Sequence, residues 1–118
     1  MEQNTNLVEF SSDRTYAVGT VLLFGGINEV TTATIVNDTR LAGVVSLSIS
    51  ENMVAIAMSG RTVCRVVGRV KKGDLLTTAN TPGCAVKALD PKLGSIIGKA
   101  LQDKDFGEAG LIEIVVLR

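Results

Sequence analysis

The sequence predicts an all-β fold: a compact, glycine-punctuated barrel or sandwich of β-clip-like layout, with about nine or ten short strands and little or no helix. Three observations support this prediction. Short apolar runs are separated by turn signals roughly every ten residues. Hydrophobic residues make up 46% of the 118 residues but aromatic residues only 3%, so Val, Ile, Leu and Ala dominate the apolar content. No long segment repeats its apolar residues with the helical period of about 3.6.

Four strands are expected in the first half of the chain, each a short apolar or alternating run that ends at a polar or glycine-containing turn. They are residues 19–24, 29–36, 41–47 and 53–58. Residues 29–36 alternate between two faces, as a half-buried strand does. Residues 53–58 are apolar throughout, which is typical of a central strand.

Five strands are expected in the second half, and clear turn signals separate them. They are residues 61–70, 75–78, 84–89, 95–101 and 111–117. In the turn at 71–74, Gly73 supplies the unusual φ. At 81–83, Pro82 suits the second and Gly83 the third position of a type II turn.

The segment 61–70 has two chemically different faces. Its core face is expected to carry Thr62, Cys64, Val66 and Val70. The other face carries Arg61, Arg65 and Arg69 between valines. Three interpretations fit this cationic face: a solvated face or one whose arginines pair with carboxylates across the sheet, an ionic subunit interface, or a nucleic-acid stripe. A net charge of zero and the lack of interleaved aromatic residues disfavour nucleic acid.

The chain is expected to divide into an N-terminal arm, residues 1–17, and a single β domain, residues 18–118. The arm is polar and charged except for a short apolar patch that contains Leu7, Val8 and Phe10. Both a frayed terminus and an arm that orders only when docked on a neighbour fit this composition. Because no signal peptide and no apolar run of about 20 residues is present, we expect no membrane partner.

Catalysis, metal binding and cofactors are not expected. Histidine is absent, which removes the commonest general base and metal ligand. Cys64 and Cys84 form no metal-binding motif, and we expect free, buried thiols rather than a disulfide. Asp103, Asp105 and Glu108 match no calcium-loop spacing, so a solvated acidic loop is the simpler interpretation.

Short motifs in a specific order resemble a known class of protein. They are GTVLLFGG at 19–26, EVT at 29–31, LAGVVS at 41–46, VAIAMSGR at 54–61, VKKGDLL at 70–76, IGKAL at 97–101 and GLIE at 110–113. Across residues 18–117, this order resembles virion structural proteins of tailed bacteriophages, especially cyanophage-type proteins in tail-fibre and head-decoration settings.

The resemblance implies a virion structural protein and carries over no catalytic residues. We expect a capsid decoration, or cement, protein that is assembled in the host cytoplasm and lies on the capsid surface. Its partner would be the major capsid protein, bound across capsomer joints. The alternative is a tail or tail-fibre component that contacts another tail protein or the host surface.

Self-association is the last expectation. Four of the expected strands are apolar on both faces and call for burial on both, whereas a domain of about 100 residues has one core. They are residues 19–24, 41–47, 53–58 and 111–117. A homo-oligomer would bury the apolar strand faces that a single core leaves uncovered, and we expect a trimer. The residues expected at protein interfaces are Leu7, Val8, Phe10, Arg61, Arg65, Arg69, Leu111 and Val115.

Overall fold

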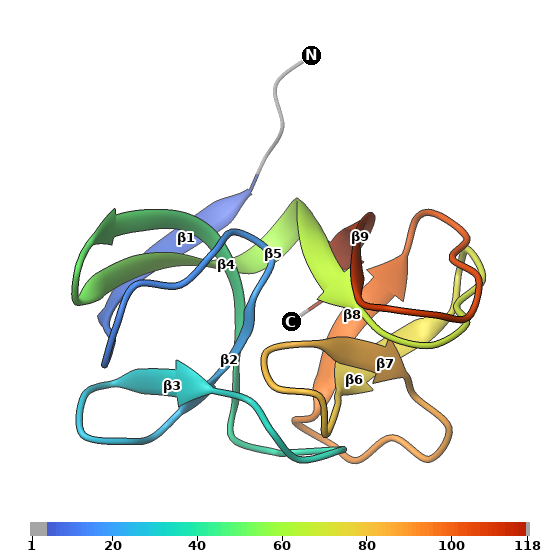
Figure 1. Ribbon diagram of the computed structural model, residues 1–118, viewed down its shortest axis with the longest axis horizontal. Coiled ribbons are helices and arrows are strands. Elements are labelled where there is room, and N and C mark those ends of the chain that lie inside the picture. Colours follow the sequence, from blue (N-terminus) through green and yellow to red (C-terminus); the bar gives the residue numbers. More distant parts are fainter. Residues whose placement is uncertain (1–4, 118) are drawn as a thin grey trace.

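The computed structural model describes residues 5–117, and within this range the chain forms nine strands and no helix (Figure 1). The strands are β1 (Asn6–Ser11), β2 (Val21–Phe24), β3 (Val30–Thr32), β4 (Leu41–Ser50), β5 (Met53–Val66), β6 (Leu75–Thr78), β7 (Ala85–Lys87), β8 (Ile96–Ala100) and β9 (Gly110–Val116). The prediction of an all-β barrel with about nine or ten short strands is confirmed.

Five of the strands close into a barrel, which occupies the right-hand part of Figure 1. Their order is β5-β7-β6-β8-β9, and β9 pairs back onto β5. This closing pair is antiparallel and runs from Gly60–Val116 to Val66–Gly110. Closure pairs both edges of the sheet and leaves no open edge there.

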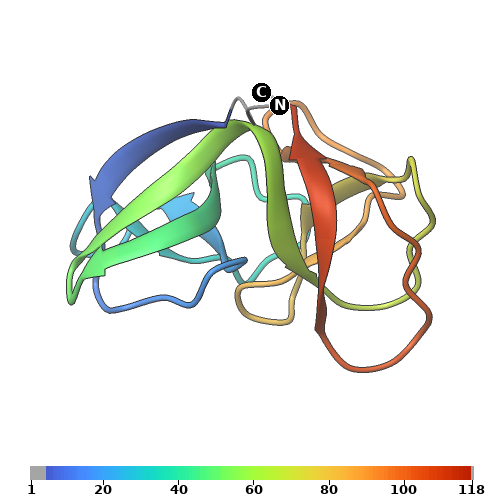
Figure 2. The same ribbon diagram turned by 90° about the horizontal axis from the view of Figure 1, so that it is seen from above.

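The other four strands extend the first half of β5 into a second sheet. β4 pairs with one edge of β5 and β1 with the other, so Val44 and Leu7 flank Ala57. β2 then pairs with β4, and β3 with β2. Figure 2 shows β5 running from this second sheet into the barrel, where it lies beside β9.

The strand β5 replaces two predicted strands, 53–58 and 61–70, with one strand of 14 residues. Ala57 and Cys64 belong to the same core cluster although their positions in the sequence differ by an odd number, seven. The side-chain alternation must therefore reset between them. The pairing with β1 shifts register at this point, and Gly60 has a φ of 96°. A bulge at this point lets both halves of β5 turn side chains, such as Ala57 and Cys64, toward the same core cluster.

Two hydrophobic clusters lie on opposite faces of β2, β4 and the first half of β5. The first fills the barrel and includes Val21, Val44, Ala57, Cys64, Leu76, Ile97 and Ile114. The second includes Tyr16, Leu22, Val30, Val45, Val54 and Ile56, with Phe10 and Met58 packed against it. The apolar segments that called for two-sided burial are thus largely covered within one chain, except that β9 buries one face only.

The predicted strand at 29–36 is the clearest difference between prediction and structure. Only Val30–Thr32 forms a strand, and Ile35 and Val36 are exposed in the loop that follows. The buried Thr78 anchors this loop, because its hydroxyl donates to the Ile35 carbonyl (2.6 Å) and accepts from the Asp38 amide (2.8 Å). These two hydrogen bonds hold residues 35–38 as a loop, although the alternating sequence alone favours a strand.

Part of the predicted N-terminal arm forms a strand. Residues 6–11 form β1, which pairs with β5 over its whole length, and Tyr16 is buried in the second cluster. The described part of the segment is therefore integrated into the sheet. The first four residues of the predicted arm lie outside the described range, and the division of the chain at residue 17 stays a prediction.

Both cysteines are free and buried, as predicted. Burial raises the pKa of Cys64 and of Cys84 above the ordinary thiol value. Both groups are therefore neutral, weakly nucleophilic thiols at neutral pH.

We predict that neither cysteine reacts with iodoacetamide in the native protein at neutral pH, because burial keeps both thiols protonated and inaccessible. After denaturation without reductant, both should react and add two alkyl groups to the intact mass. Mass spectrometry of the two samples checks this, and a denatured mass lacking both groups would show a disulfide instead.

A second prediction concerns Gly98 in β8. A Cβ at this position would lie 1.9 Å from the Val115 carbonyl oxygen, a backbone atom that cannot move aside. Gly98→Ala should therefore lower the free energy of unfolding by about 3 kcal/mol or more. The matched control is Gly110→Ala in β9, where the nearest atom is the Lys104 Cε at 3.5 Å. Urea unfolding of both variants is the measurement, and equal stability would contradict the prediction.

Candidate interaction surfaces

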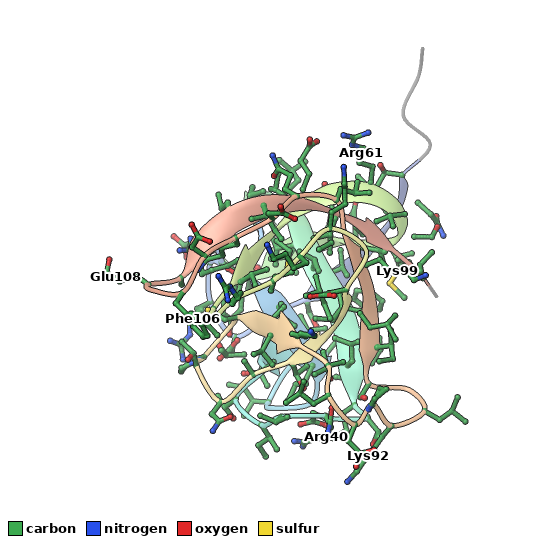
Figure 3. The ribbon with its side chains drawn as sticks, turned by 90° about the vertical axis from the view of Figure 1, so that its right-hand side faces the viewer. Arg40, Arg61, Lys92, Lys99, Phe106 and Glu108 are labelled. Carbon is green, nitrogen blue, oxygen red and sulfur yellow. The ribbon has the colours of Figure 1, made fainter. Side chains whose placement is uncertain are left out.

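The barrel exposes one strip of side chains on β5 and β9, which we call the outward face. Its members are Arg61, Val63 and Arg65 on β5 and Leu111, Glu113 and Val115 on β9. In the register, Arg61 stands opposite Val115, and Arg65 opposite Leu111. Four of the residues predicted at an interface are thus brought together. Figure 3 shows Arg61 extending outward at the top of the molecule, and in the register Lys99 of β8 stands opposite Val115 on the side away from Arg61.

The charges at the centre of the outward face neutralise each other. Arg61 donates to both carboxylate oxygens of Glu113, with Nε–Oε1 at 3.2 Å and Nη2–Oε2 at 3.0 Å. This contact lowers the pKa of Glu113. It confirms, for Arg61, the interpretation that the arginine pairs with a carboxylate across the sheet. A solvent-exposed pair of this kind contributes little to stability but leaves the face electrically balanced.

Apolar side chains flank this ion pair. Leu111 is 51% exposed, and Val63 and Val115 are half-buried. Val18, 41% exposed, was missed by sequence reasoning. It adjoins the outward face because the carbonyl of its neighbour, Gly19, accepts a hydrogen bond from the Arg65 amide (2.9 Å). That contact joins segments far apart in the sequence.

The three predicted interface residues of β1 differ in role. Leu7 and Val8 are exposed, as an interface residue must be. Phe10 is half-buried, and its ring meets the edge of Phe24 with centroids 5.2 Å apart. It therefore contributes to the second core cluster. The start of β1 touches the outward face, because the Thr5 hydroxyl donates to the Arg61 carbonyl (3.0 Å).

Leu47 and Ile49 on β4 are further exposed apolar residues that sequence reasoning missed. Leu47 is the last residue of the predicted strand 41–47 and Ile49 lies beyond it, because β4 continues to Ser50. The alternation Ser-Leu-Ser-Ile-Ser at 46–50 is the signal that could have identified them.

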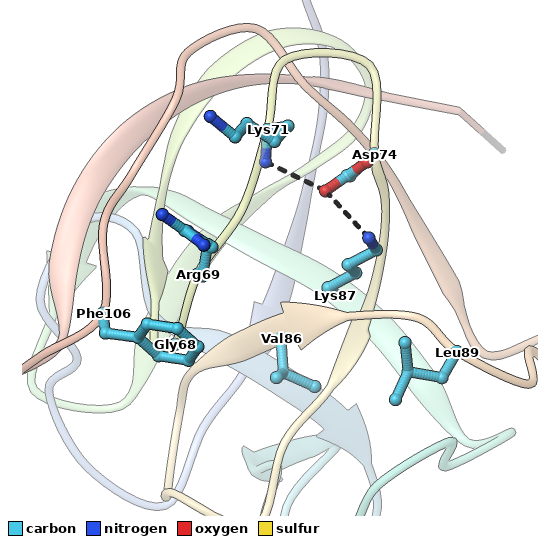
Figure 4. A pocket seen from close by; sticks show the side chains of 8 residues that line it. All are labelled: Gly68, Arg69, Lys71, Asp74, Val86, Lys87, Leu89 and Phe106. Atoms are coloured by element: carbon cyan, nitrogen blue, oxygen red, sulfur yellow. Dashed lines mark hydrogen bonds and ion pairs between the residues drawn. The ribbon is translucent and has the colours of Figure 1, made fainter.

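Arg69 lies away from the outward face, at an open pocket of about 370 Å³ (Figure 4). We call this the Arg69 pocket. It is lined by Gly68, Arg69, Lys71, Asp74, Val86, Lys87, Leu89 and Phe106. The Arg69 guanidinium lies over the Phe106 ring, 5.4 Å from its centroid. Asp74 accepts a hydrogen bond from the Lys71 amide (2.9 Å) and pairs with the Lys87 ammonium at 3.6 Å.

Within residues 5–117, no three acidic, cysteine or histidine side chains come together as a metal site would require. Asp103 instead accepts a hydrogen bond from the Lys72 amide (2.8 Å) and so fastens the loop before β9 to the turn before β6. The same range contains no helix that is long and apolar enough to cross a membrane.

Comparison with known proteins shows a similarity at the level of the fold. No protein-family model and no curated protein matches the chain. The crystal structure of the N base of the head fiber protein gp8.5 from bacteriophage phi29 matches it with a TM-score of 0.62. The two chains are 20% identical, and the match covers 95% of each. At this level of identity the match shows that the two chains share a fold.

Proposed function

We propose that this protein is a structural component of the virion of a tailed bacteriophage, located on the head, and that its role is binding rather than catalysis. The observation that supports this most is the likeness to a head-fibre base over 95% of both chains. The order of short motifs across residues 18–117 supports the same class of protein. The absence of histidine also suits a role in adhesion.

Within this class, we favour a capsid decoration protein that binds the major capsid protein across capsomer joints. Such a protein stabilises the shell by burying surface on two neighbouring subunits at once. The outward face suits this role, because the exposed Leu111 and the half-buried Val63 and Val115 flank a neutralised ion pair rather than a free charge. Burial of apolar surface stabilises a contact by roughly 25 cal/mol per Å². Because many copies bind one shell, these contributions add up over the whole capsid.

The alternative is a tail or tail-fibre component. The match to a head-fibre base favours the head over the tail. A surface that binds host glycans would also need stacking platforms, and aromatic residues make up only 3% of the chain.

The proposal predicts that the protein separates with heads when purified virions are broken into heads and tails. Heads assembled without it should release their DNA at a temperature several degrees lower, because neighbouring capsomers lose an adhesive contact. Antibody labelling of the fractions and a thermal DNA-release assay are the measurements. Recovery in the tail fraction would contradict the head location. Unchanged DNA release from heads that lack it would contradict the decoration role.

We also propose that the chain self-associates, with a trimer as the favoured state. The argument from strands that need burial on both faces no longer supports self-association, because the second core cluster covers most of that apolar surface inside one chain. The support is instead the part of the exposed apolar surface that lies on or next to the outward face, which includes Val18, Leu111 and Leu117. A surface that combines apolar side chains with a balanced charge pair suits contact with a copy of itself.

Two neighbouring substitutions in β9 separate folding from association. Val115→Asp places a carboxylate on the outward face between Arg61 and Lys99, where the fold should tolerate it and the oligomer should not. Ile114→Asp buries a charge at a fully buried position and should unfold the domain. Light scattering and circular dichroism measure the two effects. A wild-type protein that is monomeric in solution and sits singly on the virion would contradict self-association.

A further inference from the structure

The Arg69 pocket contains more positive charge than the chain itself neutralises. Arg69, Lys71 and Lys87 line it, against the single carboxylate of Asp74, which leaves an excess of two positive charges. Asp74 is already engaged by the Lys87 ammonium and the Lys71 amide. Within the described part of the chain, no carboxylate lies within 4.0 Å of the side-chain nitrogens of Arg69 or Lys71.

The same pocket has an apolar wall that faces solvent. Phe106 is 75% exposed and Leu89 is 86% exposed, and Val86, next to Lys87 in β7, is half-buried. Figure 4 shows the Phe106 ring beside the Arg69 guanidinium at one end and Leu89 at the other. Exposed large apolar side chains that converge with unpaired charges on one pocket are typical of a binding site.

The two features together define the chemistry of the occupant. Two unpaired cations call for negative charge, because opposite charges across an interface favour binding and like charges oppose it. The apolar wall calls for an aliphatic or aromatic group next to that charge. An arginine held over an aromatic ring is well oriented to receive a carboxylate, because its planar donors match the two carboxylate oxygens.

We propose that the Arg69 pocket binds an acidic segment of a partner protein, in which a carboxylate contacts Arg69 and Lys71 and an adjacent apolar side chain packs on Phe106 and Leu89. This inference goes beyond the proposed function, because it does not depend on where the protein sits in the virion.

A protein segment fits better than a nucleic acid or a glycan. A single-stranded nucleic acid needs a basic groove with several stacking platforms, whereas Phe106 is the one aromatic residue lining this pocket. A neutral glycan would bring no negative charge to Arg69 and Lys71, so it would leave both cations without a counter-charge.

The test is an NMR titration of the ¹⁵N-labelled full chain with the peptide acetyl-Gly-Glu-Leu-Asp-Gly-amide. Amide shifts should move around Arg69, Lys87 and Phe106, with a dissociation constant in the millimolar range or below. The peptide acetyl-Gly-Gln-Leu-Asn-Gly-amide has the same shape without the charge and should bind about tenfold more weakly. A short oligothymidylate should also bind more weakly than the acidic peptide.

Two charge-matched variants locate the binding site. R69Q/K71Q should weaken binding of the acidic peptide about tenfold. K92Q/K99Q removes the same net charge from side chains outside the pocket, both labelled in Figure 3, and should leave the affinity unchanged. F106A tests the apolar wall and should also weaken binding. Equal losses in the two double variants, shifts that map elsewhere, no binding at millimolar peptide, or tighter binding of oligothymidylate would each overturn the proposal.

Discussion

Both sheets of this protein depend on the point near Gly60 where the side-chain alternation of β5 is reset. Without the reset, a strand whose even-numbered residues face the barrel at Cys64 would turn Ala57 away from it. The bulge and the left-handed φ of Gly60 absorb the mismatch. One strand then pairs with β1 and β4 in the second sheet and with β9 in the barrel. The closure of the barrel therefore depends on a backbone conformation that glycine adopts at little cost.

This arrangement explains how so apolar a chain folds with so few aromatic residues. Strand β2 and the first half of β4 bury both of their faces, one toward the barrel and one toward the cluster around Tyr16. Aliphatic side chains with few polar atoms pack such two-sided layers without leaving unsatisfied groups. The apolar residues that stay exposed therefore contribute little to either core cluster.

The sequence was sufficient to predict what local rules control. The fold class, the turns at 71–74 and 81–83, the two faces of 61–66 and the buried free cysteines all follow from alternation and turn chemistry. Three features could not be predicted, because each depends on contacts between distant segments. The loop after β3 is held by Thr78, β1 is a strand because β5 offers it an edge, and the Arg69 pocket forms where Phe106 meets Arg69.

The predicted strand 61–70 also shows that local sequence patterns do not determine contacts between distant segments. Arg61, Arg65 and Arg69 share a face by alternation, but β5 ends at Val66, so Arg69 leaves the strand and enters a different environment. Arg61 has a carboxylate partner, so a neighbour can cover it at a lower cost than it could cover an unpaired charge. Arg69 has an aromatic ring but no carboxylate, so covering it favours a partner that brings negative charge. Arginines that look equivalent in the sequence therefore suit different partners: Arg61 a balanced, partly apolar surface such as a second copy, and Arg69 an acidic one.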